Sequence, residues 1–264
     1  MENRIIAKFQ ELRSVKRKAF IAYLTLGYPD LETTVRLVPA LEKAGADIIE
    51  LGIPFSDPMA DGPTIQAASS QALKNNLTLA KMWKTVKRIR RVSSIPLAFM
   101  TYYNPIHFCG ARRFIEQSRQ AGVDGLIVPD LPLEEADSFR ALADKSQLAT
   151  VFFVSPTTPT SRIGRLADAS TGFVYYISLA GVTGARKRLP GDLSRRIKTV
   201  KSHSRRPVCV GFGISTPQQV RQIARVADGV IVGSAIIKEI ARHQSRKDML
   251  TRVARFVKHL TRGL

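Results

Sequence analysis

Short apolar runs recur along the whole sequence and constrain its fold more than any other feature. Eight runs are present, at residues 20–26, 48–51, 97–102, 125–128, 150–154, 173–177, 208–210 and 230–232. They do not alternate apolar with polar residues as strands of a half-exposed antiparallel sheet do, so we predict strands covered on both faces. Strands of this kind belong to a parallel sheet.

The segments between these runs predict how the strands are connected. Apolar residues at helical spacing, such as Val38 and Leu41 before Gly45, indicate amphipathic helices. A helix end, a tight turn and a strand recur in AGADIIELG (44–52), AGVDGLIVPD (121–130) and ADGVIVGS (227–234). Eight such units without a flexible linker favour a closed (βα)8 barrel, the TIM barrel, over a doubly wound open sheet.

The length fits one such domain. A barrel of this class takes about 250 residues, so we expect residues 1–264 to form a single domain. The amphipathic segment 5–12 predicts an extra N-terminal helix across the bottom of the barrel, and the segment after the eighth run predicts a short helix there. Catalytic groups of such barrels lie where strands end, and the longest connections there are 52–63, 103–111 and 178–190.

Composition and the N-terminus bear on the location of the protein. No stretch approaches about 18 uninterrupted apolar residues, and MENRIIAKFQ lacks the apolar core of a signal peptide. Cys109 and Cys209 lie far apart and indicate free thiols rather than a disulfide framework or a zinc site. We therefore expect a cytoplasmic protein with no membrane association.

The net charge of +20 is high. Such a field attracts nucleic acid, anionic membranes or phosphorylated metabolites. The basic residues fall mostly in predicted helices and are interpreted as solvated outer faces: Lys84, Lys87, Arg88, Arg90, Arg91, Arg195, Arg196, Lys198, Lys201, Arg242, Arg246, Arg252 and Arg255. Aromatic residues that would stack on bases are not interleaved with them, so we expect no nucleic-acid partner.

Glycines at the ends of the last two strands indicate a phosphate site. The seventh strand runs into GFGIS (211–215), and the eighth runs into Gly233 and Ser234 followed by a helical segment. Glycines let the backbone approach an anion, and the N–H groups of a helix start point at it. Together with GVTG (181–184), these loops predict a phosphorylated small-molecule substrate.

Acidic residues cluster after the second strand. Glu50 lies inside the apolar run IIELGI, where an ionisable group is costly to bury unless a task or a partner requires it. Asp57 and Asp61 follow in Pro- and Gly-bounded turns, where capping is the ordinary role of an aspartate. Spacing alone does not separate these two aspartates.

Several segments taken together resemble the tryptophan synthase α family. They are ELGIPFSDPMADGPTIQ (50–66), YNPI (103–106), VPDLP (128–132), SLAGVTG (178–184), GFGIS (211–215) and GS (233–234). The similarity spans the first strand to the eighth. It implies a carbon–carbon lyase of tryptophan biosynthesis that cleaves indole-3-glycerol phosphate to indole and glyceraldehyde 3-phosphate.

The resemblance also implies residue roles. Glu50 and Asp61 correspond to the catalytic carboxylates, Tyr175 to a tyrosine beside the catalytic Glu, and Thr183 to a threonine of the mobile sixth loop. The indole pocket corresponds to Tyr23, Met100, Ile127 and Phe212, and the phosphate contacts to Gly184, Gly213, Gly233 and Ser234. The sequence departs from the family at Leu179, where several relatives carry Arg, at Tyr28, which replaces a frequent Asp, and in its basic charge.

The implied reaction is a retro-aldol cleavage, which needs a base and an electron sink. No lysine ends a predicted strand, and the four histidines are scattered without ligand spacing, so neither a Schiff base nor a metal is expected. A protonated indole ring can be the sink, without a cofactor. We expect Glu50 to shuttle protons between indole C3 and the C3′ hydroxyl while Asp61 stays ionised and holds the indole N–H.

The family resemblance implies a partner subunit, and the residues themselves leave alternative functions open. The expected partner is a tryptophan synthase β subunit in an alpha2beta2 heterotetramer, in which only the β subunit carries pyridoxal phosphate. The loop with Pro54, Asp57, Pro58 and Met59 and the connection near Asn104 are the expected docking surface. Alternatives are a catalytically weak α-like activator of the β subunit, another phosphate-binding barrel such as indole-glycerol-phosphate synthase or a sugar-phosphate isomerase, and a nucleic-acid binder.

Overall fold

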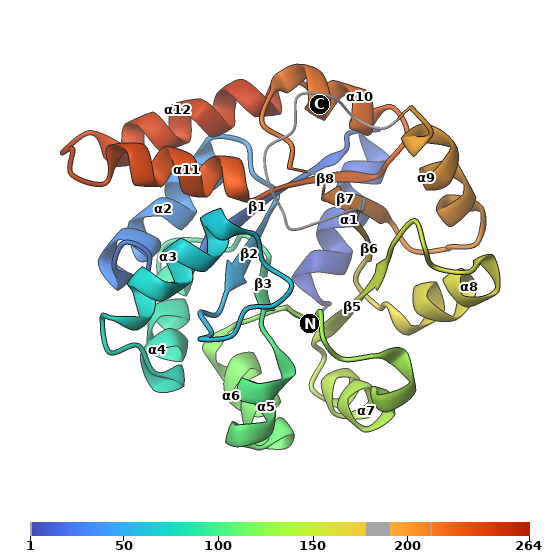
Figure 1. Cartoon of the computed structure of the whole chain (residues 1–264), viewed down its shortest axis with the longest axis horizontal. Helices are drawn as coiled ribbons and strands as arrows, with labels where there is room; N and C mark the ends of the chain where they lie inside the picture. Colours follow the sequence, from blue (N-terminus) through green and yellow to red (C-terminus); the bar gives the residue numbers. More distant parts are fainter. Residues whose placement is uncertain (1, 178–190, 212) are drawn as a thin grey trace.

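The fold is a closed barrel of parallel strands surrounded by helices (Figure 1). The computed structural model describes residues 2–177, 191–211 and 213–264. Its strands are β1 (Ala19–Thr25), β2 (Ile48–Gly52), β3 (Leu97–Met100), β4 (Gly125–Ile127), β5 (Ala149–Val154), β6 (Val174–Ile177), β7 (Val208–Gly211) and β8 (Gly229–Val232). Each strand pairs with the next one along the chain, and β8 pairs with β1. The predicted (βα)8 barrel is confirmed, with strand ends shifted by one or two residues.

Helices connect and cover the strands. They are α1 (Arg4–Ser14), α2 (Leu31–Lys43), α3 (Pro63–Leu73), α4 (Leu79–Arg90), α5 (Tyr103–Cys109), α6 (Ala111–Ala121), η1 (Leu133–Glu135), α7 (Asp137–Lys145), α8 (Thr160–Ala169), α9 (Leu193–Ser202), α10 (Pro217–Ala224), α11 (Ser234–His243) and α12 (Met249–Thr261). The long connection after the third strand, at residues 103–111, is not an open loop, because α5 occupies most of it. Pro105 lies in the first turn of α5, where a helix tolerates proline.

Successive side chains of a strand point alternately outward and inward, and this divides the apolar residues into two cores. Side chains such as Phe20, Phe99 and Val210 face outward and pack between the sheet and the helices. Side chains such as Ile21, Ala98 and Ile127 face inward and fill the barrel. The barrel interior is therefore a packed core rather than a channel.

The N-terminal helix α1 closes the end of the barrel where the strands begin. Ile5, Phe9 and Leu12 are spaced on one face of α1 and belong to the same core as the inward-facing strand residues. The side chain of Asn3 caps the helix by accepting from the Ile5 amide at 3.0 Å. Its amide donates to the backbone oxygens of Asp124 and Gln147, just before β4 and β5, at 2.7 and 2.9 Å. The predicted helix across the barrel bottom is confirmed.

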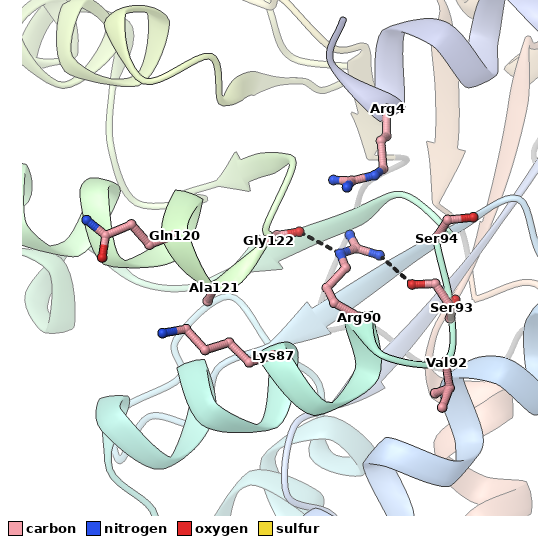
Figure 2. Close-up of a pocket in the computed structure, with 9 residues that line it drawn as sticks. All are labelled: Arg4, Lys87, Arg90, Val92, Ser93, Ser94, Gln120, Ala121 and Gly122. Carbon is pink, nitrogen blue, oxygen red and sulfur yellow. Dashed lines mark hydrogen bonds between the residues drawn. The ribbon is translucent and has the colours of Figure 1, made fainter. Parts of the chain in front are cut away.

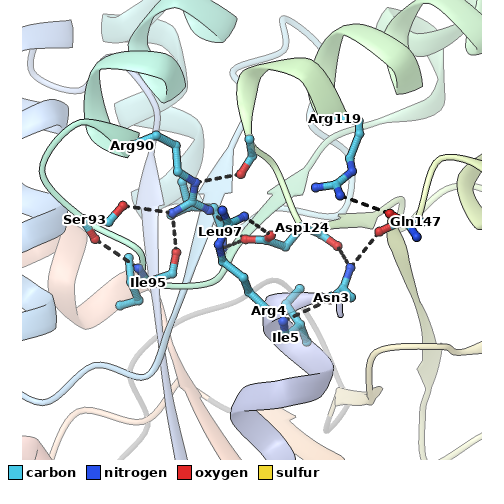
Figure 3. A network of polar contacts seen from close by, with 11 residues as sticks. Asn3, Arg4, Ile5, Arg90, Ser93, Ile95, Leu97, Arg119, Asp124 and Gln147 are labelled. Carbon is cyan, nitrogen blue, oxygen red and sulfur yellow. Dashed lines mark hydrogen bonds and ion pairs between the residues drawn. The ribbon is translucent and has the colours of Figure 1, made fainter. Parts of the chain in front are cut away.

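One basic residue was wrongly interpreted from the sequence as part of a solvated face. Arg90 ends α4, but its side chain is only 12% exposed and donates to Asp124 Oδ2 at 2.7 Å. Asp124 also accepts from Arg4 at 2.8 Å and from the Leu97 amide at 2.9 Å (Figure 3). The pattern of positive charges was interpreted as a solvated helix face, whereas the turn before β4 brings the buried carboxylate of Asp124 to Arg90.

Within the described ranges, no helix combines the length and the apolar character that crossing a bilayer would require. Cys209 is buried in β7 and Cys109 is partly buried at the end of α5, and both are free thiols, as expected from their spacing.

Candidate active site

Glu50 is a buried carboxyl group inside the barrel. It lies in the middle of β2, in register with Tyr23 of β1 and Ala98 of β3, and Ala98 belongs to the inward-facing core. Its side chain has no exposed surface, and neither carboxyl oxygen has a hydrogen-bond partner among the described residues. Burial raises the pKa of Glu50 to about 8. At neutral pH this group is mostly protonated, and it can both give and take a proton.

Two tyrosines share the surroundings of Glu50. Tyr23 and Tyr175 are 5% and 9% exposed. Burial is the largest cause that raises the pKa of Tyr175 above its ordinary value, and the charge of Glu50 is the next. Burial, followed by the charge of Asp61, likewise raises the pKa of Tyr23. Both phenols therefore stay neutral, and Tyr175 lies beside Glu50.

Glycines at two strand ends make room for these rings. A Cβ atom at Gly52 would overlap the Tyr23 hydroxyl, and one at Gly211 would lie 2.8 Å from the Tyr175 ring. Such distances are too short for any real side chain, so the rings lie directly over the backbone of β2 and β7. The glycines allow two bulky side chains to lie at the rim of the barrel without widening it.

Asp61 lies in the connection after β2 and is held by Tyr102, which lies between β3 and α5. The Tyr102 hydroxyl donates to Asp61 Oδ2 at 3.1 Å and accepts from the Ala60 amide at 3.0 Å. The Gln66 side chain donates to the Asp61 carbonyl at 2.8 Å. Burial raises the pKa of Asp61 to about 6, against the lowering effect of the Tyr102 hydrogen bond. Asp61 is thus an anion at neutral pH.

The structure separates the two aspartates that spacing could not distinguish. Asp57 is exposed and accepts from the neighbouring Ser56 hydroxyl at 2.5 Å. Asp61 is only 7% exposed and is among the charges that act on Tyr23 and Tyr175. Only Asp61 therefore joins Glu50 in one electrostatic environment.

Met100 and Ile127 lie next to each other on the inward face of β3 and β4. Their Cα atoms are register partners, and Met100 also pairs with Gly52. Ile127 is fully buried, whereas Met100 is partly exposed at the end of its strand. Together they present an apolar wall beside the carboxyl groups. Phe212, the fourth residue expected in this pocket, lies outside the described residues.

The last two strands end beside each other, and their following residues suit an anion. Gly211 of β7 pairs with Ile231 of β8, and Gly213 has a left-handed φ of 64°. Gly233 is the N-cap of α11, and Ser234 begins this helix with 5% of its surface exposed. The free N–H groups of the first turn of α11 and their partial positive charge make an anion site there. Thr183, Gly184 and Leu179 lie outside the described residues.

Tyr102 was missed by sequence reasoning. The signal was present, since it ends the third apolar run directly before the YNPI segment. A tyrosine in such a run looks like apolar lining, and only the three-dimensional path of residues 53–62 brings Asp61 to its hydroxyl. Among the described residues, no group of three or more His, Cys, Asp or Glu side chains could hold a metal ion.

Known proteins resemble this chain over nearly its full length. The family model for the tryptophan synthase alpha chain matches residues 9–264. A tryptophan synthase alpha chain from Geotalea daltonii is 48% identical over 99% of this chain and 98% of its own. One from Thermoanaerobacter sp. strain X514 is 45% identical over 98% of both chains.

Solved structures show the same relationship. Tryptophan synthase subunit alpha from Legionella pneumophila is 38% identical, with a TM-score of 0.93 over 100% of this chain and 98% of its own. A Pyrococcus furiosus structure, described as a basis of mutual activation of the tryptophan synthase a2b2 complex, is 42% identical, with a TM-score of 0.86 over 92% of this chain and 97% of its own. By full-length identity and by fold, this chain belongs to the tryptophan synthase alpha chain family.

Proposed function

We propose that Glu50 and Asp61 are the catalytic pair with which this chain cleaves indole-3-glycerol phosphate to indole and glyceraldehyde 3-phosphate. The cleavage itself is the lyase reaction of the alpha chain family. The observation that carries the assignment is the carboxyl group of Glu50, fully buried and without a hydrogen-bond partner among the described residues. Such a group is costly to keep in a strand without a chemical task.

The two pKa values suit a division of labour. Glu50, with a pKa of about 8, begins as the acid and gives its proton to indole C3. The positive charge that develops on the indole nitrogen is stabilised by the Asp61 carboxylate, whose pKa is about 6. Glu50, now a carboxylate, removes the proton of the C3′ hydroxyl.

The bond between indole C3 and C3′ then breaks. Its electron pair moves onto C3 and restores the aromatic indole, while the C3′ oxygen becomes the carbonyl oxygen of the aldehyde. Glu50 ends the cycle protonated, as it began, so protons and electrons balance. The indole ring is itself the electron sink, and the reaction needs no cofactor.

The neighbouring side chains have binding roles in this proposal. Tyr23, Met100 and Ile127 line the indole pocket, and Tyr175 binds the substrate beside Glu50. The backbone of Gly213 and Gly233 and the start of α11 at Ser234 hold the phosphate. Phe212 is assigned to the indole pocket, Thr183 to loop closure and Gly184 to the phosphate by the family resemblance alone.

The chain acts with a tryptophan synthase β subunit in this proposal. A related structure is described as the a2b2 complex, which supports an alpha2beta2 heterotetramer. The family resemblance assigns pyridoxal phosphate to the β subunit alone. Met59 is 80% exposed after β2 and Phe108 is 91% exposed in α5. Apolar side chains so exposed beside Asp57, Pro58 and Asn104 support docking at this surface. We place the single domain of residues 1–264 in the cytoplasm.

The proposal is tested by an indole assay on the purified chain. Indole-3-glycerol phosphate should yield indole and glyceraldehyde 3-phosphate in equal amounts, and glycerol 3-phosphate should compete with it. Added β subunit should raise the rate. A chain that releases no indole alone or with the β subunit, yet still stimulates the β subunit, would instead be an activator only.

A further inference from the structure

A strongly basic cavity lies at the opposite end of the barrel from Glu50 and Asp61. It measures about 610 Å³ and is lined by Lys16, Arg17, Lys18, Arg221, Arg225 and Arg262. Residues 16–18 lead directly into the start of β1, and Arg225 precedes the start of β8. Figure 1 shows the C-terminal end of the chain beside α10, where this cavity is formed. The proposed substrate site lies where the strands end and is therefore separate.

Close backbone packing brings these cations together. A Cβ atom at Gly263 would lie 2.5 Å from the Pro217 carbonyl oxygen, so the chain after α12 lies directly on the first turn of α10. Arg262 is thereby placed at the same cavity as Arg221 of α10. Lys16 joins them from a tight turn with a left-handed φ of 57°. Three segments distant in sequence thus form one positively charged wall.

Most of this charge is uncompensated within the chain. Arg17 pairs with Asp47, and Lys18 lies 3.5 Å from Asp228. The remaining four cations, Lys16, Arg221, Arg225 and Arg262, have no ion pair with any carboxylate of the described chain. Arg221 and Arg225 are also four residues apart, a spacing at which like charges repel along a helix. A bound anion would relieve this repulsion.

A second basic cavity provides a contrast. Figure 2 shows it between α4 and the turn before β4, lined by Arg4, Lys87 and Arg90 among others. There Arg4 and Arg90 both pair with Asp124. Arg90 also donates to the backbone oxygens of Gly122 and Ile95, at 2.8 and 2.6 Å. Arg4 and Arg90 are therefore occupied in holding the fold together, whereas Lys16, Arg221, Arg225 and Arg262 have no such ion pair among the described residues.

We propose that the cavity lined by Arg221, Arg225, Arg262 and Lys16 binds a small polyphosphate anion. Guanidinium groups match pairs of phosphate oxygens in a planar fork, and several unpaired cations suit a ligand with several charges. Val15, which is 65% exposed, together with Ala224 and Leu264 adds an apolar edge to the same cavity. In this proposal the edge contacts an organic group attached to the phosphates.

The test is calorimetric titration of the full chain with inorganic triphosphate and, separately, with ATP at about 0.15 M salt. We expect binding at one site, weakened about tenfold or more in R221Q/R225Q because charge-assisted hydrogen bonds are lost. The matched control is R195Q/K198Q, which removes the same charge from exposed positions of α9. It should change the Kd by less than about twofold. Equal affinities would support recognition of phosphate alone, and tighter ATP binding would support contact with the apolar edge.

Three results would overturn the proposal. Equal weakening in both double variants would show attraction by the overall charge rather than a site. Binding that survives R221Q/R225Q but is displaced by glycerol 3-phosphate would place the anion at the other end of the barrel. Preference for duplex DNA over triphosphate would make the surface a nucleic-acid interface. If the double variant folds poorly, Arg262→Gln repeats the test at an exposed position. Indole release should be unchanged in every variant.

Discussion

The hydroxyl of Tyr102, which lies between the third strand and α5, donates a hydrogen bond of 3.1 Å to Oδ2 of Asp61, in the connection that follows the second strand. The same hydroxyl accepts from the Ala60 amide, so its proton is directed at the carboxylate. This bond lowers the pKa of Asp61 against the effect of burial. Tyr102 is therefore a positioning residue that keeps Asp61 ionised.

Tyr102→Phe should raise the pKa of Asp61 above about 6, because burial would then act without the opposing hydrogen bond. The acidic limb of the kcat/KM profile should move to higher pH. Tyr103→Phe is the matched control, since the Tyr103 ring packs on Phe139 and its hydroxyl has no hydrogen bond to the described residues. An unchanged acidic limb in Tyr102→Phe would refute the positioning role.

The pH profile of the wild type should be bell-shaped. Below about pH 6 Asp61 gains a proton and loses the charge that stabilises the indole nitrogen, and above about pH 8 Glu50 loses the proton it must donate. Steady-state measurement of kcat/KM from well below the lower limit to well above the upper one checks the assignment. Activity that keeps rising beyond the upper limit would contradict an acidic role for Glu50.

Asp61→Asn should lower kcat by about 10²-fold or more and remove the acidic limb, because an amide cannot balance the positive charge on indole. Asp57→Asn is the matched control in the same loop, since Asp57 is exposed and, among the described residues, its side chain is bonded only to Ser56. A change confined to KM would show that Asp61 serves ground-state binding rather than the transition state.

Asp124→Asn should destabilise the barrel by about 3 kcal/mol or more, because it leaves the buried Arg90 guanidinium without its charge partner. Arg88→Gln is the comparison, since it breaks an exposed ion pair with Glu32 and should cost less than about 1 kcal/mol. Urea unfolding of both variants measures the difference. Equal losses would show that the network in Figure 3 is no more important than a surface ion pair.

Burial of Glu50 should also have a cost in stability. Its pKa is raised in the folded state, so stability is greatest below the ordinary value of 4.5 and declines as the pH rises towards about 8. At alkaline pH, urea unfolding should therefore give Glu50→Gln a free energy of unfolding at least about 1 kcal/mol above that of the wild type. Near pH 4.5, the ordinary pKa of a glutamate, the two free energies should differ little. Exposed Glu116→Gln should show no such gain. A stability difference between Glu50→Gln and the wild type that is the same at both pH values would mean that Glu50 is not buried in solution.

Much of the fold was predictable because barrel strands are buried on both faces and stand out as apolar runs. Glu50 stood out for the same reason, as a charge inside such a run. The choice between Asp57 and Asp61 was not predictable from local sequence, because it depends on where the loop meets Tyr102. Arg90 was misinterpreted for a similar reason, since its partner Asp124 lies on a different βα unit.

The most direct measurement compares indole release by wild type, Glu50→Gln and Glu116→Gln, each with and without the β subunit. General acid–base catalysis typically contributes about 10²–10⁴-fold, so Glu50→Gln should lose at least the lower figure while keeping its fold and its ability to stimulate the β subunit. Glu116→Gln, exposed on α6, should match the wild type. Near-normal indole release by folded Glu50→Gln would contradict the central claim.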